Sequence, residues 1–277
     1  MQIFRQQKHQ EQFDRDGVIS FPALNTSQIA EVITMYSDVK PLKMPDGGIY
    51  SNITEHESAL NWQISERMIE IFRPFLEKHF INYKVSGGMY LVKNNGPESG
   101  CPLHQDYNLV DEALHSAVNI WCPLTDVNEK NGCLQAVLGS HRMFDTIRSL
   151  NIPSIRIDFE ERLEKHLTAF PVEAGTAIVY SLNLFHGSKP NNSDKVRVAT
   201  VMTLSHESAC RMHFLKNEEN IQVVSAEKNF VFETVRSFHL EGKLTGLEQL
   251  RILPVDTKTS ITVEEFYNRI DSKQGEC

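Results

Sequence analysis

A succession of short apolar runs, separated by turn-forming residues such as Asn131-Gly132, begins near Tyr83 and continues to Leu204. Strands of this length and spacing are typical of all-β sandwiches and barrels. The chain is therefore expected to be mainly β with flanking helices, in a double-stranded β-helix of the jelly-roll or cupin type. The predicted strands are Met89–Val92, Ser116–Leu124, Cys133–Leu138, Thr176–Leu182 and Val196–Leu204.

Helical patterns flank this predicted core. Ser27–Val39 follows the cap-like residue Asn25 and carries apolar side chains at helical spacing, as does Asn61–Phe80. Pro74 lies inside the second segment and is expected to kink or restart the helix. A short strand is expected at Val18–Phe21. After Ser205 we expect two more strands, a helix near Asn229–Phe238 and a last helix near Val263–Ile270.

The length of 277 residues, of which 40% are hydrophobic, supplies enough apolar material for one large domain or two small ones. No repeat, low-complexity stretch or Gly/Ser-rich linker marks a boundary. We therefore predict a single domain over residues 1–277. It comprises N-terminal helices in 1–82, a jelly-roll core at about 83–205, and a C-terminal extension in 206–277 that forms a lid or a dimer contact.

The charge balance and the cysteines restrict where the protein works. Lys and Arg total 28 against 36 Asp and Glu, a formal net charge of −8, which argues against binding to nucleic acid or to a membrane surface. No apolar run approaches the ~18 residues of a membrane span, and Met1–Gln12 lacks an apolar signal-peptide segment. A scattered, odd set of cysteines indicates a reduced, cytoplasmic chain. They are Cys101, Cys122, Cys133, Cys210 and Cys277.

The segment His104-Gln105-Asp106 contains two side chains of the kind that bind non-haem Fe(II). Residues i and i+2 of a strand point to the same face, so His104 and Asp106 are expected to project into one space. An imidazole and a carboxylate are two thirds of the facial triad of such iron sites. By itself the pattern is weak, because a chain with 11 His contains on the order of half such a match by chance.

Two other residues, which lie later in the sequence, strengthen the interpretation of His104 and Asp106 as metal ligands. His186 lies directly after the apolar run Thr176–Leu182, where the end of a strand would present it. Arg197 lies inside the apolar segment Val196–Val201, where burial of its charge is costly unless an anion meets it. The chain thus offers a third metal ligand and an anion-binding group.

Together these residues suggest a division of labour. Two histidines and one carboxylate leave three adjacent metal positions free, two for a chelating 2-oxo acid and one for O2. The far carboxylate of the co-substrate needs a fixed cation, and the planar guanidinium of Arg197 suits it better than a lysine. The turn Gly187–Asp194 would bring Arg197 back beside His186, and Ser188 is placed to donate a further hydrogen bond.

In several separate segments the chain resembles the phytanoyl-CoA dioxygenase (PhyH) family of Fe(II)/2-oxoglutarate-dependent oxygenases. The resemblance covers roughly residues 10–204 and departs from the family pattern at Lys130, where the family favours Glu, and at Leu138, where it favours Pro. The matching segments are Phe13–Ile19, His104–Asp106, Asp126–Leu134 followed by Gly139–His141, and His186–Ser188 with Arg197.

The resemblance implies metal ligation by His104, Asp106 and His186, and 2-oxoglutarate binding by Arg197 and Ser188. It implies hydroxylation of an unactivated C–H of a small molecule. Fe(II) would act as the cofactor, 2-oxoglutarate and O2 would be consumed, and succinate and CO2 would be released. Halogenation is not expected, because Asp106 fills the position that chloride takes in related halogenases. Desaturation, epoxidation and ring formation stay open.

The resemblance also implies co-substrate contacts from Met89 and Trp121, for which ordinary core packing is the competing interpretation. Asn119 shares a strand face with Trp121, and a polar residue there favours a lined pocket over a dry core. For Lys93 two interpretations stay open, which are a solvated residue at the end of a strand and a contact with the co-substrate.

Two other functions compete with the oxygenase. One is a jelly-roll protein that binds a metal or a 2-oxo acid without turnover, although no ligand and no arginine is missing from the set. The other is a cupin-type isomerase or lyase, which leaves Arg197 unexplained.

The substrate itself is expected to be a small molecule, for example a natural-product intermediate, and the sequence does not choose one. Tyr107 and Asn108, just past the metal carboxylate, and parts of Asn52–Trp62 are expected to line its side of the cleft. Arg211 and His213 follow the last core strand and would also reach the cleft, with a surface ion pair as the alternative for Arg211.

Overall fold

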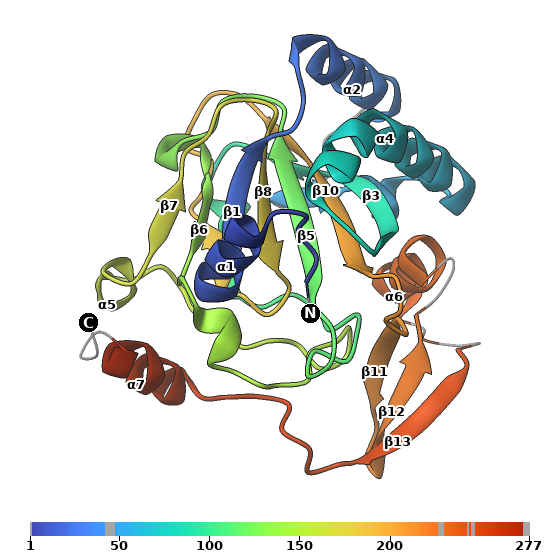
Figure 1. Ribbon diagram of the computed structural model, residues 1–277, viewed down its shortest axis with the longest axis vertical. Coiled ribbons are helices and arrows are strands. Elements are labelled where there is room, and N and C mark those ends of the chain that lie inside the picture. The colour runs from blue at the N-terminus through green and yellow to red at the C-terminus, as the bar shows by residue number, and fades with distance from the viewer. Residues whose placement is uncertain (1, 42–47, 227–229, 243, 245–246, 274–277) are drawn as a thin grey trace.

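The computed structural model describes residues 2–41, 48–226, 230–242, 244 and 247–273 (Figure 1). Within these residues the main sheet has six strands in the order β1-β8-β5-β10-β3-β2. Its neighbouring strands pair antiparallel. In sequence order the strands are β1 (Val18–Pro22), β2 (Ile49–Ser51), β3 (Tyr83–Lys93), β5 (Ala117–Pro123), β8 (Thr176–Ser181) and β10 (Arg197–His206).

A smaller sheet of four antiparallel strands, in the order β4-β9-β6-β7, faces the main sheet. Apolar side chains from both sheets, among them Leu134 and Val201, form one core between them. This two-layered arrangement is the jelly roll, so the predicted mainly β fold with flanking helices is confirmed. The four strands are β4 (Cys101–His104), β6 (Leu134–Ala136), β7 (Thr168–Phe170) and β9 (His186–Ser188).

The central strand β5 is buried along its whole length. Val118, Ile120 and Cys122 face a core that the N-terminal helices cover. Trp121 belongs to the core between the two sheets, and Asn119 shares its face. A strand covered on both sides reads as one apolar run, and the single Asn within it marks the face that carries the site.

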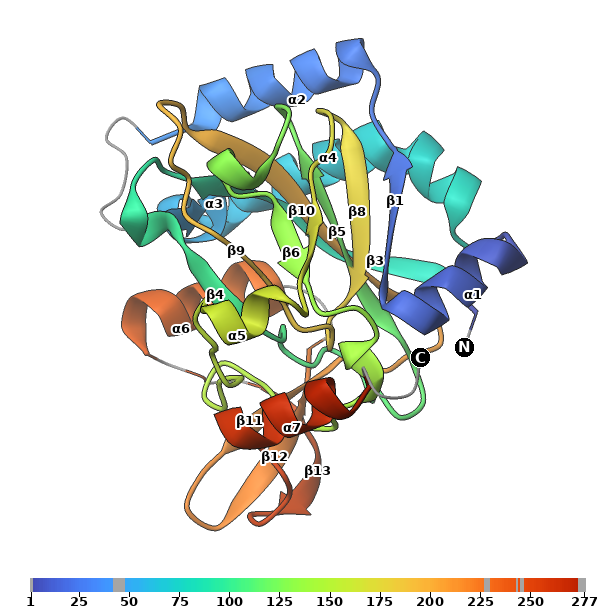
Figure 2. The ribbon, with the colours of Figure 1, turned by 90° about the vertical axis from the view of Figure 1, so that its left-hand side faces the viewer.

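The helices lie outside the sheets, and Figure 2 shows α2 and α4 along one side of the main sheet. Helix α2 begins at a capping box, in which Asn25 and Gln28 exchange side-chain and backbone hydrogen bonds. The restart expected at Pro74 is wrong, because α4 continues through it to His79, and the expected kink stays a prediction. None of the described helices is long and apolar enough to cross a bilayer. The helices are α1 (Gln7–Asp16), α2 (Thr26–Val39), α3 (Asn52–Glu55), α4 (Ser58–His79), α5 (Glu161–Glu164), α6 (Arg236–Glu241) and α7 (Val263–Lys273).

Short helical turns complete the described chain. Three are 3-10 turns, and the fourth, η4, is a π-helix that leads directly into α6. The helix predicted near Asn229–Phe238 therefore corresponds to η4 and α6, while Asn229 itself lies outside the described residues. The turns are η1 (Pro97–Ser99), η2 (Glu129–Asn131), η3 (Ser140–Arg142) and η4 (Phe230–Val235).

The C-terminal part forms a third sheet of three strands, β11-β12-β13. The two strands predicted after Ser205 are β11 (Met212–Lys216) and β12 (Asn220–Ser225). The third, β13 (Gln249–Pro254), was not predicted from the sequence, because it lies at an edge with Leu250 and Ile252 exposed and shows no buried face.

Helix α7 returns from this third sheet to the jelly roll, as Figures 1 and 2 show. Its residue Phe266 is fully buried and contacts the rings of Phe144 and Phe185, with centroid distances of 5.7 and 4.8 Å. Leu103 of β4 belongs to the same apolar cluster. The last described helix thus helps to hold the small sheet in place.

We predict that Phe266→Ala lowers the free energy of unfolding by about 3–5 kcal/mol, because it leaves a cavity between α7 and the small sheet. Chemical denaturation followed by circular dichroism measures this loss. Val263→Ala on the same helix is the control, since Val263 is 46% exposed and its truncation should change stability by no more than about 0.5 kcal/mol. Equal effects of the two substitutions would contradict the described docking of α7.

Candidate metal centre

Pairing of β4 with β9 brings two histidines together. His104 ends β4, His186 begins β9, and the two are direct partners in the antiparallel register. Their rings lie with centroids 4.7 Å apart. Asp106 follows two residues after His104, and its backbone N–H donates to the carbonyl of Leu182 at 2.8 Å. Residues 82 positions apart in the chain thus meet at one edge of the small sheet.

The side chains of these three residues converge on one point. Nε2 of His104 lies 3.5 Å from Oδ1 of Asp106, and Nε2 of His186 lies 3.7 Å from Oδ2. One potential ligand atom from each of the three lies within 4.8 Å of the others. Two imidazoles and a carboxylate in this arrangement form a facial triad, the donor set of non-haem Fe(II) sites.

Backbone carbonyls determine the tautomer of both histidines. Nδ1 of His104 lies 2.9 Å from the carbonyl oxygen of Pro102, and Nδ1 of His186 lies 2.9 Å from that of Leu184. A carbonyl only accepts, so Nδ1 carries a hydrogen in both rings and Nε2 is the atom that faces the centre. Burial lowers the pKa of His186 to about 4, which keeps this imidazole neutral.

Asn119 and Thr203 fix the orientation of the carboxylate. Nδ2 of Asn119 donates to Oδ2 of Asp106 at 2.7 Å, and Oγ1 of Thr203 donates to Oδ1 of Asn119 at 2.6 Å. Burial opposes ionisation of Asp106, but the neighbouring histidines and Asn119 lower its pKa to about 2. The structure therefore shows Asn119 hydrogen-bonded to the carboxylate of Asp106, and its expected contact with the co-substrate stays a prediction.

Arg148 is a supporting residue that the sequence analysis missed. It is fully buried, and its Nε donates to the backbone carbonyl of Asp106 at 2.8 Å. Its Nη2 donates to both carboxylate oxygens of Glu112, at 2.6 and 2.9 Å. The available signal was an arginine between the apolar residues Ile147 and Leu150, the same kind of signal that singled out Arg197.

We predict that Arg148→Met lowers the free energy of unfolding by about 3–5 kcal/mol, because Glu112 is left as a buried carboxylate without its partner. The double variant Arg148→Met/Glu112→Leu should regain part of this loss. Arg162→Met is the control, because its pair with Asp271 is exposed and worth at most about 1 kcal/mol. Denaturant titration compares the variants, and an equal loss in Arg148→Met and Arg162→Met would refute the supporting role.

A second part of the site is built around Arg197, which is 3% exposed. Its Nη1 donates to the carbonyl of Gly132 at 2.7 Å, and the guanidinium carbon lies 5.1 Å from the ring centroid of Trp121. Nε is buried, and no atom of the described residues accepts a hydrogen bond from it. Burial lowers the pKa of Arg197 to about 10, so it stays charged at neutral pH.

Lys93 is the register partner of Arg197 on the neighbouring strand β3. It is fully buried, and its Nζ donates to Oγ of Ser188 at 2.6 Å and to the carbonyl of Lys189 at 2.7 Å. Of the two alternatives left open for Lys93, the solvated strand end is therefore wrong. Burial and, after it, the charge of Arg197 lower the pKa of Lys93 to about 7.

These two cations meet no carboxylate among the described residues. Because a protonated lysine can only donate, Oγ of Ser188 accepts from Lys93 and its own hydrogen is directed elsewhere. Ser188 and Arg197 both line the cavity described next, so the hydroxyl and the guanidinium charge lie beside an anion bound there. The chemistry of this part of the site is that of a carboxylate receptor.

A cavity of about 650 Å³ joins the two parts. It is lined by the triad of His104, Asp106 and His186 and by Arg197, by Met89, Trp121 and Asn119, and by Tyr107 from the expected substrate residues. Of the segment Asn52–Trp62, which was expected to contribute to the substrate side, Ile53, Thr54 and Glu55 line the cavity.

Asn108, Arg211 and His213 do not line this cavity. Oδ1 of Asn108 accepts from the backbone N–H of Arg148 at 2.6 Å, and His213 is buried with Nε2 accepting from Leu150 at 3.1 Å. Both side chains therefore satisfy backbone groups instead of facing the cleft.

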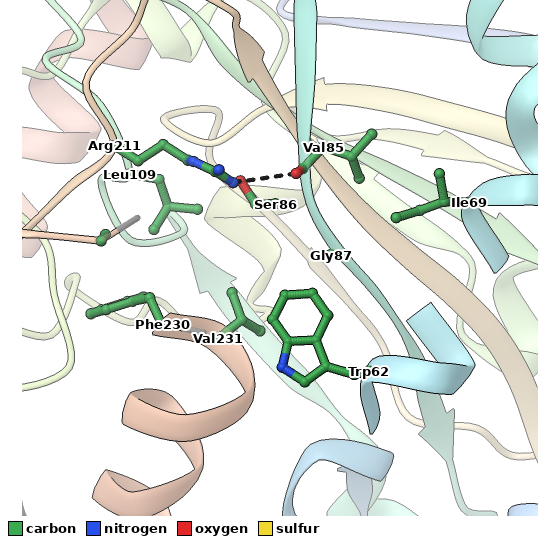
Figure 3. A pocket seen from close by; sticks show the side chains of 10 residues that line it. Trp62, Ile69, Val85, Ser86, Gly87, Leu109, Arg211, Phe230 and Val231 are labelled. Carbon is green, nitrogen blue, oxygen red and sulfur yellow. Dashed lines mark hydrogen bonds between the residues drawn. The ribbon is translucent and has the colours of Figure 1, made fainter. Parts of the chain in front are cut away.

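Arg211 lines a separate, smaller cavity of about 80 Å³ (Figure 3). Its Nη1 donates to Oγ of Ser86 at 3.0 Å and to the carbonyl of Val85 at 3.3 Å. The two cavities share the wall residues Leu109, Phe230 and Val231, which separate Arg211 from the metal centre.

Comparison with known proteins agrees with this geometry. The model of the phytanoyl-CoA dioxygenase (PhyH) family matches residues 43–199, more than half of the chain. The chain belongs to the PhyH family. Dioxygenase olcK of Penicillium canescens is 30% identical over 166 residues, which cover 57% of this chain and 49% of that protein. Phytanoyl-CoA dioxygenase of Arabidopsis thaliana is 28% identical over 131 residues, 46% of each chain. This PhyH protein thus spans about half the length of the curated relatives it matches.

Solved structures share its fold. The epimerase SnoN, in complex with Fe3+, alpha ketoglutarate and nogalamycin RO, is similar at a TM-score of 0.53 with 17% identity, covering 92% of this chain and 94% of SnoN. EvdO2 of Micromonospora carbonacea var. aurantiaca, complexed with 2-oxoglutarate, is similar at a TM-score of 0.50 with 18% identity, covering 73% of this chain and 91% of EvdO2.

Proposed function

We propose that this PhyH protein is a non-haem Fe(II)/2-oxoglutarate-dependent dioxygenase that hydroxylates an unactivated C–H of a small molecule and releases succinate and CO2. One observation carries the proposal: the triad His104, Asp106 and His186 lines the same cavity as Arg197, a buried cation that meets no carboxylate among the described residues. A metal site alone would not need a buried guanidinium beside it, whereas a chelated dicarboxylate would.

The donor set suits ferrous iron. Nε2 of His104, Nε2 of His186 and the carboxylate of Asp106 would hold the ion, because all three are oriented by hydrogen bonds before any ion arrives. When bound, ferrous iron and 2-oxoglutarate supply the activation of O2 and the oxidation of the C–H. SnoN carries Fe3+ and alpha ketoglutarate on the same fold.

The carboxylate receptor would hold the far end of the co-substrate. Arg197 offers its guanidinium charge, Ser188 offers its hydroxyl, and Lys93 adds a positive charge from behind Ser188. Trp121 supports the guanidinium, and Met89 lines the same cavity. Asp106 occupies the position that a halide would need, which favours hydroxylation over halogenation.

We infer the cellular setting from the cysteine side chains. Within the described chain Cys101, Cys122, Cys133 and Cys210 are free, and Cys277 lies outside the described residues. We therefore place the enzyme in the reducing cytoplasm, where thiols and ferrous iron both persist. We also propose that residues 1–277 act as one domain, since α7 packs on the jelly roll.

The test is to add Fe(II) and 2-oxoglutarate to the protein without oxygen and then to admit O2. We expect a weak visible charge-transfer band, followed by succinate formation. Asp106→Ala should weaken metal binding by at least about 100-fold, because it removes a ligand and not only its support. Asp158→Asn is the control, since Asp158 is exposed and outside the cavity. A band without any succinate across a substrate panel would favour the non-catalytic binding protein, and no band at all would refute the metal site.

A further prediction concerns pH. Lys93, with a pKa lowered to about 7, is charged below that pH and neutral above it. Affinity for 2-oxoglutarate should therefore fall as pH rises through about 7, by roughly tenfold for a lost charge-assisted contact.

Binding of 2-oxoglutarate to the Fe(II) protein, measured without oxygen between pH 6 and 8.5, checks this prediction. Lys93→Met should bind weakly and without this step. The matched control ligand is 2-oxobutyrate, which lacks the far carboxylate, so its affinity should not show the step in either protein. A step that persists in Lys93→Met would assign the titration to another group.

A further inference from the structure

The large cavity has an outer end whose walls differ from those of the metal centre. This end is largely apolar, and its walls come from both terminal regions of the chain. We define this outer end by its apolar residues, which are Ile53 from α3, Leu109 from a loop of the jelly roll, and Phe230, Val231 and Val235 from η4.

Hydrogen bonds join the two terminal regions around this outer end. Oγ of Ser58, the first residue of α4, donates to the carbonyl of Phe232 at 2.7 Å. Nε of Arg236 donates to the carbonyl of His56 at 2.8 Å. Hydrogen bonds thus hold the two sides of the outer wall together, and the cavity of about 650 Å³ must hold both the co-substrate and the substrate. Sites for single small molecules span about 300–1,000 Å³.

The charges of the outer end are unlike those of a phosphate site. Among the described lining residues Arg197 is the only Arg or Lys, and it belongs to the carboxylate receptor. Among the described lining residues the only carboxylate besides Asp106 is Glu55, which is exposed. Phosphate groups are held by Arg, Lys or converging backbone N–H groups. Besides Arg197, the described lining offers a substrate with several phosphates, such as an acyl-CoA, a single further basic side chain, His239 of α6, and such a substrate would also meet Glu55.

We propose that the outer end binds an apolar small molecule that is uncharged or carries one cationic or hydrogen-bond-donating group, and that Glu55 receives this group. This assignment of a substrate class rests on the proposed function. It names Glu55 as a specificity-determining residue, with η4 as the apolar wall that limits the size of the substrate.

The experiment uses four probes with the same ten-carbon chain: decylamine, decanol, decanoate and decanoyl-CoA. Their dissociation constants are measured calorimetrically on the full chain loaded with Fe(II) and 2-oxoglutarate without oxygen, and on the metal-free chain. We expect decylamine and decanol to bind, decanoate to bind roughly tenfold more weakly than decylamine, and decanoyl-CoA to bind most weakly. Tighter binding of decanoate or decanoyl-CoA than of decylamine would overturn the proposal.

Variants assign the effect to its residues. Glu55→Gln should remove the preference for decylamine over decanoate and leave decanol binding unchanged, whereas Glu66→Gln, an exposed change outside the cavity, should keep it. Val235→Trp should fill the outer end and abolish binding of decanol while 2-oxoglutarate still binds. A preference that survives in Glu55→Gln, or decanol binding that survives in Val235→Trp, would overturn the proposal.

Failure of this proposal differs from failure of the proposed function. If succinate forms from 2-oxoglutarate but the order of the probes is reversed, the oxygenase stands and the substrate class is wrong. If the probes bind to the metal-free chain in the expected order but no charge-transfer band develops, the cavity chemistry stands and the oxygenase is wrong.

Discussion

The antiparallel pairing of β4 with β9 is the constraint on which the site depends, because it sets His104 directly opposite His186. Neither strand holds more than a few residues, so the pair is kept in register by what surrounds it. Leu103 and Phe185, beside the two histidines, are fully buried against α7, and Arg148 holds the carbonyl of Asp106. The surroundings of the small sheet therefore determine the geometry of the triad.

The second constraint is electrostatic. Lys93 and Arg197 are buried side by side. They donate hydrogen bonds to Ser188, Lys189 and Gly132, but no negatively charged group of the described chain pairs with them. Two cations held together in this way are costly for folding and are stabilised when an anion arrives. The two buried cations thus lower the stability of the empty protein, and they favour a ligand with a carboxylate at that end.

Much of this could be predicted from the sequence because the relevant signals are local. Strand spacing indicated the jelly roll, the i, i+2 pattern of His104 and Asp106 indicated a shared face, and an arginine inside an apolar strand indicated a buried anion site. Pro74 shows the limit of local inference, since α4 continues through it. Edge strand β13 shows another limit, because an exposed edge leaves no pattern of burial to detect.

The sequence by itself determined which residues can bind a metal and an anion, because the chemistry of a side chain and the face of its strand are properties of neighbouring residues. Only the tertiary structure decided which groups support them. Asn119 donates a hydrogen bond to Asp106, Arg211 lines a separate cavity, and η4 forms a wall of the large cavity. These outcomes depend on contacts between residues tens to more than a hundred positions apart, and no local pattern encodes the distance between two such side chains.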